Sequence, residues 1–276
     1  MRIGFIFSVI FWCYGANAQR HLNAEMDSLY VDSIRNFEIQ LEGLSNNIIN
    51  GTDKAERITS CFYFVQTLKE ALKVPNSFDY DFNSLKTVSA LRPDDNRFRI
   101  FTWNLLLDSG RYMYFGAIQM NSDDSLVLFG LYDSSEYNRD ITYGEFDNRH
   151  WMGALYYQIH HYVWKKKDYY LTFGWDGQNN KTNRKIIDVL WFDESNRPHF
   201  GDEIFNLEGD LVSRLIFDFS DNTSMLCRYD SDLDAIVYAH LVPLNPTLVG
   251  RYENYVPDGT YDMLKFEKGT WRRYEL

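Results

Sequence analysis

Six histidines are the first candidates for metal chemistry in this chain of 276 residues, because neutral imidazole is a common metal ligand. Their spacing argues against a shared site. His160 and His161 are adjacent in an expected strand, where neighbouring side chains point to opposite faces of a sheet. The sequence also contains no His-Glu-x-x-His and no Cys-x-x-Cys pattern. We therefore predict no metal site and no cofactor.

The acidic segment 230–234 has carboxylates at the first, third and fifth positions, as calcium loops do. Ala235 follows, at the position where an EF-hand needs Gly for its sharp turn. The twelfth position of the segment holds no Glu. An acidic hairpin turn between two strands is the simpler interpretation.

Catalytic signatures are absent from the sequence, which contains neither Gly-x-Ser-x-Gly nor Ser-x-x-Lys. Asp193-Glu194 and Asp202-Glu203 come closest to the paired carboxylates of a glycosidase. Adjacency in sequence does not measure the distance across a sugar, so we interpret these pairs as solvated turn residues. We predict no catalytic residue.

The polar segment 174–184 is the best candidate for a binding loop. It joins an aromatic strand to a hydrophobic run and gathers amide groups around Trp175, an arrangement that suits a glycan or a peptide. We expect Trp175 itself to pack inward, as in an ordinary hairpin turn. The predicted binding residues are Asn179, Asn180, Asn183 and Arg184.

Residues 22–72 have the periodicity of a helical hairpin. In the first helix, apolar residues recur at steps of four and three: Tyr30, Ile34, Phe37, Leu41, Leu44 and Ile48. Asn50-Gly51 ends this helix, and Asp53 with Glu56 has the spacing of a capping box. The expected apolar face of the second helix consists of Ile58, Cys61, Phe62, Val65, Leu68 and Leu72. We expect residues 19–75 to form a hairpin docked on a main domain of residues 76–276.

From about residue 97 the apolar pattern changes to the period of two that is typical of strands. Turn residues separate the runs 97–107, 111–120 and 125–132, which predicts an antiparallel meander. Residues 134–150 are polar and predict a long loop. Further strand-like runs follow: 151–164, 169–175, 185–192, 199–205, 211–219, 223–229, 235–241, 261–266 and 270–275.

These short runs favour a sandwich-like domain. A propeller-like sheet is the second choice, since no repeat of about 40–50 residues is visible. The predicted class is therefore α+β, with an N-terminal helical hairpin followed by a large, mainly antiparallel β domain.

Composition and charge restrict the partners. The chain is 45% hydrophobic and 17% aromatic, which favours pleated, half-buried surfaces. Its formal net charge of −11 argues against nucleic acids and anionic membranes as partners. Cys61 and Cys227 lie among apolar residues, and we expect buried free thiols, although an oxidising compartment would permit a disulfide.

The first eighteen residues have the features of a secretory signal peptide. Arg2 supplies a positive n-region, residues 3–14 are apolar, and Ala16-Asn17-Ala18 offers a peptidase site before Gln19. The apolar run is too short to span a bilayer. Lipidation of Cys13 would need a small residue just before it, and Trp12 is large. We expect a periplasmic or secreted protein with no integral membrane segment after signal removal.

Segments spread over about residues 151–276 resemble an uncharacterised family of exported proteins from Bacteroidetes. They are Phe-Gly-Trp-Asp-Gly at 173–177, Lys-Ile-Ile-Asp-Val-Leu at 185–190, Pro-His-Phe-Gly at 198–201, Arg-Tyr-Asp at 228–230, His-Leu-Val-Pro at 240–243 and Tyr-Val-Pro-Asp-Gly-Thr-Tyr-Asp at 255–262. The resemblance implies a bacterial envelope or extracellular location, with no assigned activity or catalytic residue.

Together these features predict a non-catalytic, exported β-rich protein that binds an envelope protein, a peptide or a glycan. The alternative is a hydrolase that acts on a glycan or related polymer with carboxylates from the loops of residues 174–203. Export and abundant Asp and Glu are its only support in the sequence.

Overall fold

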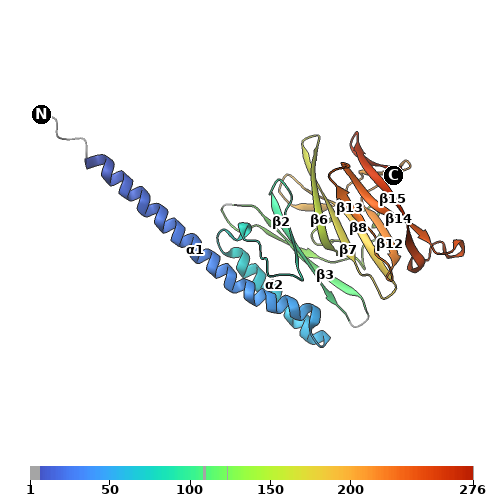
Figure 1. Ribbon diagram of the computed structural model, residues 1–276, viewed down its shortest axis with the longest axis horizontal. Helices are drawn as coiled ribbons and strands as arrows, with labels where there is room; N and C mark the ends of the chain where they lie inside the picture. Colours follow the sequence, from blue (N-terminus) through green and yellow to red (C-terminus); the bar gives the residue numbers. More distant parts are fainter. Residues whose placement is uncertain (1–6, 108–109, 123, 276) are drawn as a thin grey trace.

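Three β-sheets and a helical hairpin are stacked as four layers in the computed structural model, which describes residues 7–107, 110–122 and 124–275. The helices cover one face of a first sheet, that sheet packs on a middle sheet, and the middle sheet packs on an outer sheet (Figure 1). This arrangement confirms the predicted α+β class, with helices first and a mainly antiparallel β region after them.

The two helices are α1, Phe7–Asn50, and α2, Lys54–Lys73. The N-terminal part of α1 extends beyond the sheets (Figure 1). Among the described residues, neither this helix nor any other is both long enough and apolar enough to cross a bilayer. The described residues also form three short 3-10 helices, at Ser77–Asp79, Pro246–Leu248 and Tyr252–Asn254.

The turn between α1 and α2 follows the predicted capping pattern in part. The carboxylate of Asp53 accepts the backbone N–H of Glu56 at 2.9 Å, and the Glu56 carboxylate accepts the N–H of Thr52 at 2.9 Å. Asp53 thus satisfies a backbone donor of the first turn of α2, whereas Glu56 accepts from the residue before the N-cap and not from Asp53, as a capping box would require.

The predicted apolar stripe of α1 is confirmed, whereas that of α2 is partly wrong. Ile34, Leu41 and Ile48 are at most 1% exposed. On α2 the predicted residues Ile58, Phe62 and Val65 are instead between 43% and 58% exposed. The buried face of α2 consists of Ser60, Cys61, Phe64, Leu68, Ala71 and Leu72.

The first sheet has the order β1-β2-β3-β4 and is antiparallel throughout, which confirms the predicted meander. Its strands are β1, Ser89–Leu91; β2, Phe98–Leu106; β3, Tyr112–Met120; and β4, Leu128–Tyr132. Strand β2 divides its side chains between two cores. Phe101 and Trp103 pack among the helices, while Phe98 and Ile100 pack against the middle sheet.

The middle sheet has the order β5-β9-β8-β7-β6, and a further strand, β12, pairs with the first half of β8. Its strands are β5, Phe146–Asp147; β6, Leu155–Trp164; β7, Lys167–Asp176; β8, Thr182–Phe192; β9, Pro198–Phe200; and β12, Leu215–Ser220. Both faces of the sheet are covered. Leu171 and Phe173 of β7 face the outer sheet, and Tyr170 faces the first.

The outer sheet has the order β11-β10-β16-β15-β14-β13. Its strands are β10, Phe205–Leu207; β11, Asp210–Val212; β13, Cys227–Asp230; β14, Ala235–Pro243; β15, Tyr255–Glu267; and β16, Thr270–Glu275. The predicted runs 199–205 and 211–219 each divide into two strands that belong to different sheets. Gly201, with a φ of 93°, lies at the first of these breaks.

Cys61 and Cys227 are free, as predicted, and both are buried. They belong to different cores: Cys61 lies between the helices and the first sheet, and Cys227 between the middle and outer sheets. Burial raises the pKa of both thiols, that of Cys227 to about 12. Two protonated thiols in separate layers are structural packing groups.

Candidate functional site

A cleft of about 500 Å³ lies beside the turn that joins β7 to β8. Three segments form its walls: the start of β3, the residues that follow β4, and the β7–β8 turn. We call it the tyrosine cleft because Tyr112, Tyr114 and Tyr137 are among its lining residues. Segments far apart in the sequence thus meet at one polar, aromatic depression.

The tyrosines give the cleft an aromatic surface with polar ends. Tyr112 and Tyr114 are two residues apart on β3, so they share a face of the strand, with ring centroids 6.4 Å apart. The Tyr114 ring is buried, and its hydroxyl accepts the N–H of Gly177 at 2.8 Å. Tyr137 is 82% exposed. Such rings can pack on the apolar faces of a polar ligand while their hydroxyls form hydrogen bonds.

The carboxylate of Asp133 is fixed in the cleft wall by three donors. Its Oδ2 accepts the N–H of Tyr114 at 3.0 Å, and its Oδ1 accepts the N–H and the hydroxyl of Ser135 at 3.0 and 2.5 Å. Gly153 lies against this group, since a Cβ there would come within 2.4 Å of Asp133 Cγ. The carboxylate therefore has one orientation, and three of its roughly four acceptor positions are used, which leaves about one for a ligand hydroxyl.

Asp176 is the second carboxylate of the cleft. It accepts the N–H of Gln178 at 2.8 Å and forms a hydrogen bond with the Tyr114 hydroxyl. Burial raises the pKa of Asp176 and the nearby charge of Asp133 adds to this, whereas Gln178 and Arg184 act in the opposite direction. Burial also raises the pKa of Tyr114. The tyrosine hydroxyl therefore keeps its proton and is the donor in the hydrogen bond with Asp176.

The lining of the cleft carries an excess of negative charge. Its charged residues are Arg111, Asp133, Glu136 and Asp176, and Arg111 forms an ion pair with Glu136. The two aspartates remain as acceptors beside this pair. Such a lining favours a ligand with hydroxyl donors and disfavours an anion.

Of the four predicted binding residues, Asn179 lines the cleft. Its side chain is engaged by its own turn. Oδ1 accepts the N–H groups of Lys181 and Thr182 at 2.9 and 3.2 Å, and Nδ2 donates to the Thr182 hydroxyl at 2.8 Å. Asn179 thus shapes the turn and presents its exposed edge to the cleft.

The other three predicted binding residues do not line the tyrosine cleft. Asn180 is exposed and packs over Gly110, where a Cβ would lie 1.8 Å from its Oδ1. Asn183 is half-buried on β8, in register with β12. Arg184 donates to both oxygens of Asp218, at 2.6 and 2.8 Å, and this ion pair is largely enclosed.

The predicted loop 174–184 is mostly strand. Strand β7 continues to Asp176 and β8 begins at Thr182, so only residues 177–181 form the turn. Trp175 is half-buried, and its ring meets that of Tyr112 edge-on with centroids 5.5 Å apart. Trp175 therefore supports a wall of the cleft through Tyr112.

The acidic segment 230–234 is the hairpin turn between β13 and β14, as predicted. The Oδ1 atom of Asp230 accepts the N–H groups of Asp232 and Leu233 at 3.1 and 3.3 Å. Asp230 also binds Arg228 through its second oxygen, at 2.7 Å. These bonds engage both oxygens of Asp230 within the turn.

The aspartate of each carboxylate pair considered from the sequence has a partner within the protein. Asp193 accepts the N–H groups of Ser195 and Arg197 at 2.8 and 2.9 Å in the turn after β8. Asp202 binds Lys167 at 3.0 Å. Neither aspartate lines the tyrosine cleft.

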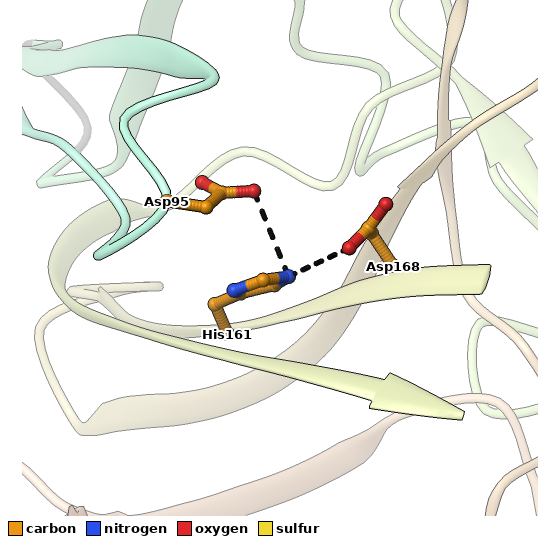
Figure 2. Close-up of side chains that lie close together, drawn as sticks. All are labelled: Asp95, His161 and Asp168. Atoms are coloured by element: carbon orange, nitrogen blue, oxygen red, sulfur yellow. Dashed lines mark hydrogen bonds and ion pairs between the residues drawn. The ribbon is translucent and has the colours of Figure 1, made fainter. Parts of the chain in front are cut away.

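The adjacent histidines of β6 face opposite sides of the sheet, as predicted. His160 stacks on Tyr229 with centroids 3.4 Å apart, and His161 stacks on Tyr170. Both histidines are half-buried. His161 lies beside two aspartates from other segments (Figure 2), the one group in the described residues whose ligand atoms could converge on a metal ion.

Sequence reasoning missed the cleft because its walls come from three segments that are far apart in the sequence. A partial signal was present: Tyr112 and Tyr114 alternate along one strand, a pattern that places two phenol rings on one face. Comparisons with family models, with curated proteins and with solved structures find no match.

Proposed function

We propose that this protein is a non-catalytic binding protein of the bacterial envelope or extracellular space, and that the tyrosine cleft receives a neutral glycan. The observation that carries the proposal is the composition of the cleft, in which tyrosine rings lie beside the carboxylates of Asp133 and Asp176. Sugar rings offer apolar C–H faces for stacking and hydroxyl donors for carboxylates. The predicted export and the resemblance to exported Bacteroidetes proteins are consistent with this role.

The state of the two carboxylates favours binding over catalysis. Asp133 has three internal donors, and Asp176 is engaged by Gln178 and Tyr114. A nucleophile or general acid needs a carboxyl group that can approach the scissile bond. Carboxylates held in this way serve better as fixed acceptors for ligand hydroxyls.

The test is a glycan screen with the mature protein, followed by calorimetry of each candidate that binds. Tyr137→Ala removes the most exposed ring of the cleft and should weaken binding by about tenfold or more. Tyr261→Ala is the matched control, because Tyr261 is a 45% exposed tyrosine on β15 outside the cleft. Equal affinity of the two variants would place the ligand elsewhere.

A glycan hydrolase is the second candidate, favoured by one observation. Burial gives Asp176 a raised pKa while its neighbour Asp133 is held by donors, and an acid paired with a carboxylate is the arrangement of glycosidases. Asp176→Asn distinguishes the two functions. A hydrolase would release new reducing ends and lose that activity in the variant; a binding protein would release none, before or after the substitution.

A further inference from the structure

His161 and two aspartates from distant segments form a cluster that lies outside the tyrosine cleft. His161 is on β6, Asp168 is on β7, and Asp95 belongs to the turn before β2. The Nε2 atom of His161 lies 2.9 Å from Asp168 Oδ1 and 3.6 Å from Asp95 Oδ2 (Figure 2). Both carboxylates therefore converge on the same nitrogen of the ring.

These separations match those of a metal-ligand set. Zn²⁺ binds histidine nitrogen and carboxylate oxygen at about 2.0–2.2 Å, so tetrahedral ligand atoms stand roughly 3.3 Å apart. The observed distances of 2.9 and 3.6 Å lie on either side of this value. One imidazole with two carboxylates also suits Zn²⁺ better than Ca²⁺ or Mg²⁺, which prefer oxygen ligands alone.

The cluster has outer-shell partners that orient its members. The Tyr170 hydroxyl donates to Asp95 Oδ2 at 2.6 Å, and its ring stacks on the His161 ring with centroids 4.8 Å apart. Arg97 lies 3.5 Å from the second oxygen of Asp168, which leaves Oδ1 facing His161. Hydrogen-bonded carboxylates of this kind are usual around metal ligands.

Arg97 also sets an upper limit on affinity, because its positive charge lies close to the cation position. It is held there by Asn196, at 2.8 Å, and by the ring of Phe192, at 4.8 Å. With neutral His161, the two aspartates and Arg97 sum to one negative charge. A site with so small a net charge would bind a divalent ion reversibly. Part of the ion would be open to solvent, since the Asp95 and Asp168 side chains are 25% and 38% exposed.

We propose that Asp95, His161 and Asp168 form a Zn²⁺ site with three protein ligands and one position open to water or a ligand group. The three ligands join the turn before β2 to the β6–β7 hairpin, so the ion would link the first sheet to the middle sheet. Spacing motifs could not predict this site, because Asp95 and Asp168 lie 66 and 7 positions from His161, outside any metal-ligand spacing motif.

The chain offers a matched control in His199. This histidine also contacts two carboxylates, but Glu145 lies 2.9 Å from its Nδ1 and Asp193 lies 3.5 Å from its Nε2. Because the two carboxylates meet opposite edges of the ring, they cannot share one ion with it. Each histidine thus has two carboxylates beside it. Both carboxylates meet the same nitrogen of His161, whereas they meet different nitrogens of His199.

The experiment is calorimetric titration of chelator-treated mature protein with Zn²⁺ at pH 7.5. We expect one equivalent to bind, and His161→Ala to weaken binding by about a hundredfold or more, since loss of an outer-shell partner alone costs roughly 10–100-fold. His199→Ala should bind as the wild type does, and Arg97→Gln should bind more tightly. Asp95→Asn, in an exposed turn, replaces His161→Ala if that variant does not fold.

Three results would overturn the proposal. The wild type could bind no Zn²⁺, which would make the cluster an ordinary ion pair between His161 and its aspartates. His161→Ala and Asp95→Asn could both retain wild-type affinity. Finally, His199→Ala could weaken binding as much as His161→Ala, which would place the ion elsewhere.

Discussion

Arg214 forms an ion pair with Asp188 that is enclosed within the protein. The Arg214 Nε atom lies 3.1 Å from Asp188 Oδ1, and the two side chains are 0% and 1% exposed. The guanidinium also donates to the carbonyl oxygens of Gly144 and Phe200 at 2.8 and 3.1 Å. Arg214, which lies just before β12, therefore holds the loop between β4 and β5 against the middle sheet. That loop begins with the residues that form a wall of the tyrosine cleft.

Arg214→Met should destabilise the protein by about 3–5 kcal/mol, because it leaves the buried Asp188 carboxylate without its counterion. Chemical denaturation measures this loss. Arg197→Met is the control: Arg197 pairs with Asp193 at 2.7 Å, but its side chain is 70% exposed, so its removal should cost less than about 1 kcal/mol. Similar losses in the two variants would contradict the enclosed pair.

The docked face of α1 supplies a second prediction. Leu41 is 0% exposed, so Leu41→Asp should destabilise the protein by roughly 3–5 kcal/mol through an unpaired buried charge. Ile39 on the same helix is 62% exposed, and Ile39→Asp should change stability by less than about 0.5 kcal/mol. Thermal melts of the two variants compare these positions. An unchanged melting temperature for Leu41→Asp would mean that this face is not docked.

Periodicity predicted α1 from about residue 22 to Asn50, although the helix begins at Phe7, and it predicted the first meander. In each case the apolar pattern was compatible with one arrangement. The turn residues between 97 and 132 allow only one pairing of three strands. Helix α2 carries two apolar stripes, one through Ile58 and Phe62 and another through Phe64 and Leu68. Hydrophobic spacing cannot choose between them. The choice depends on where α1 and the first sheet lie, which is tertiary information.

The sites were harder to predict because their residues meet only after the layers stack. Asp133 and Asp176 are 43 positions apart and share a cleft through contacts with Tyr114. Arg184 appeared available as a binding residue, but Asp218 lies across a strand pair that the sequence does not reveal. The sequence pattern also did not predict that residues 199–219 divide between the middle and outer sheets.

Trp175 should behave as a supporting residue of the cleft. It is half-buried against Tyr112, so Trp175→Ala should cost about 1–3 kcal/mol. Trp271, only 1% exposed in the core between the middle and outer sheets, provides the comparison, and Trp271→Ala should cost about 3–5 kcal/mol. Urea denaturation of both variants gives the two values. Equal losses would show that Trp175 is a full core residue.

The stability of the protein should fall in mild acid because of His160. Burial lowers the pKa of His160 to about 4 from its ordinary value of 6.5. Between these pH values the unfolded chain binds a proton at His160 that the folded chain does not. Stability therefore rises with pH across this window, and it is lost as pH falls from 6.5 towards 4.

His160→Phe should remove this contribution while keeping a ring to stack on Tyr229. We expect the variant to lose less stability than the wild type between pH 6.5 and 4, measured by denaturation at a series of pH values. His150→Phe is the control, because the His150 side chain is 65% exposed and carries no comparable burial. If His160→Phe kept the wild-type dependence on pH, the acid sensitivity would come from other groups. The stacked imidazole would then bind a proton between pH 6.5 and 4 in the folded protein as it does in the unfolded chain.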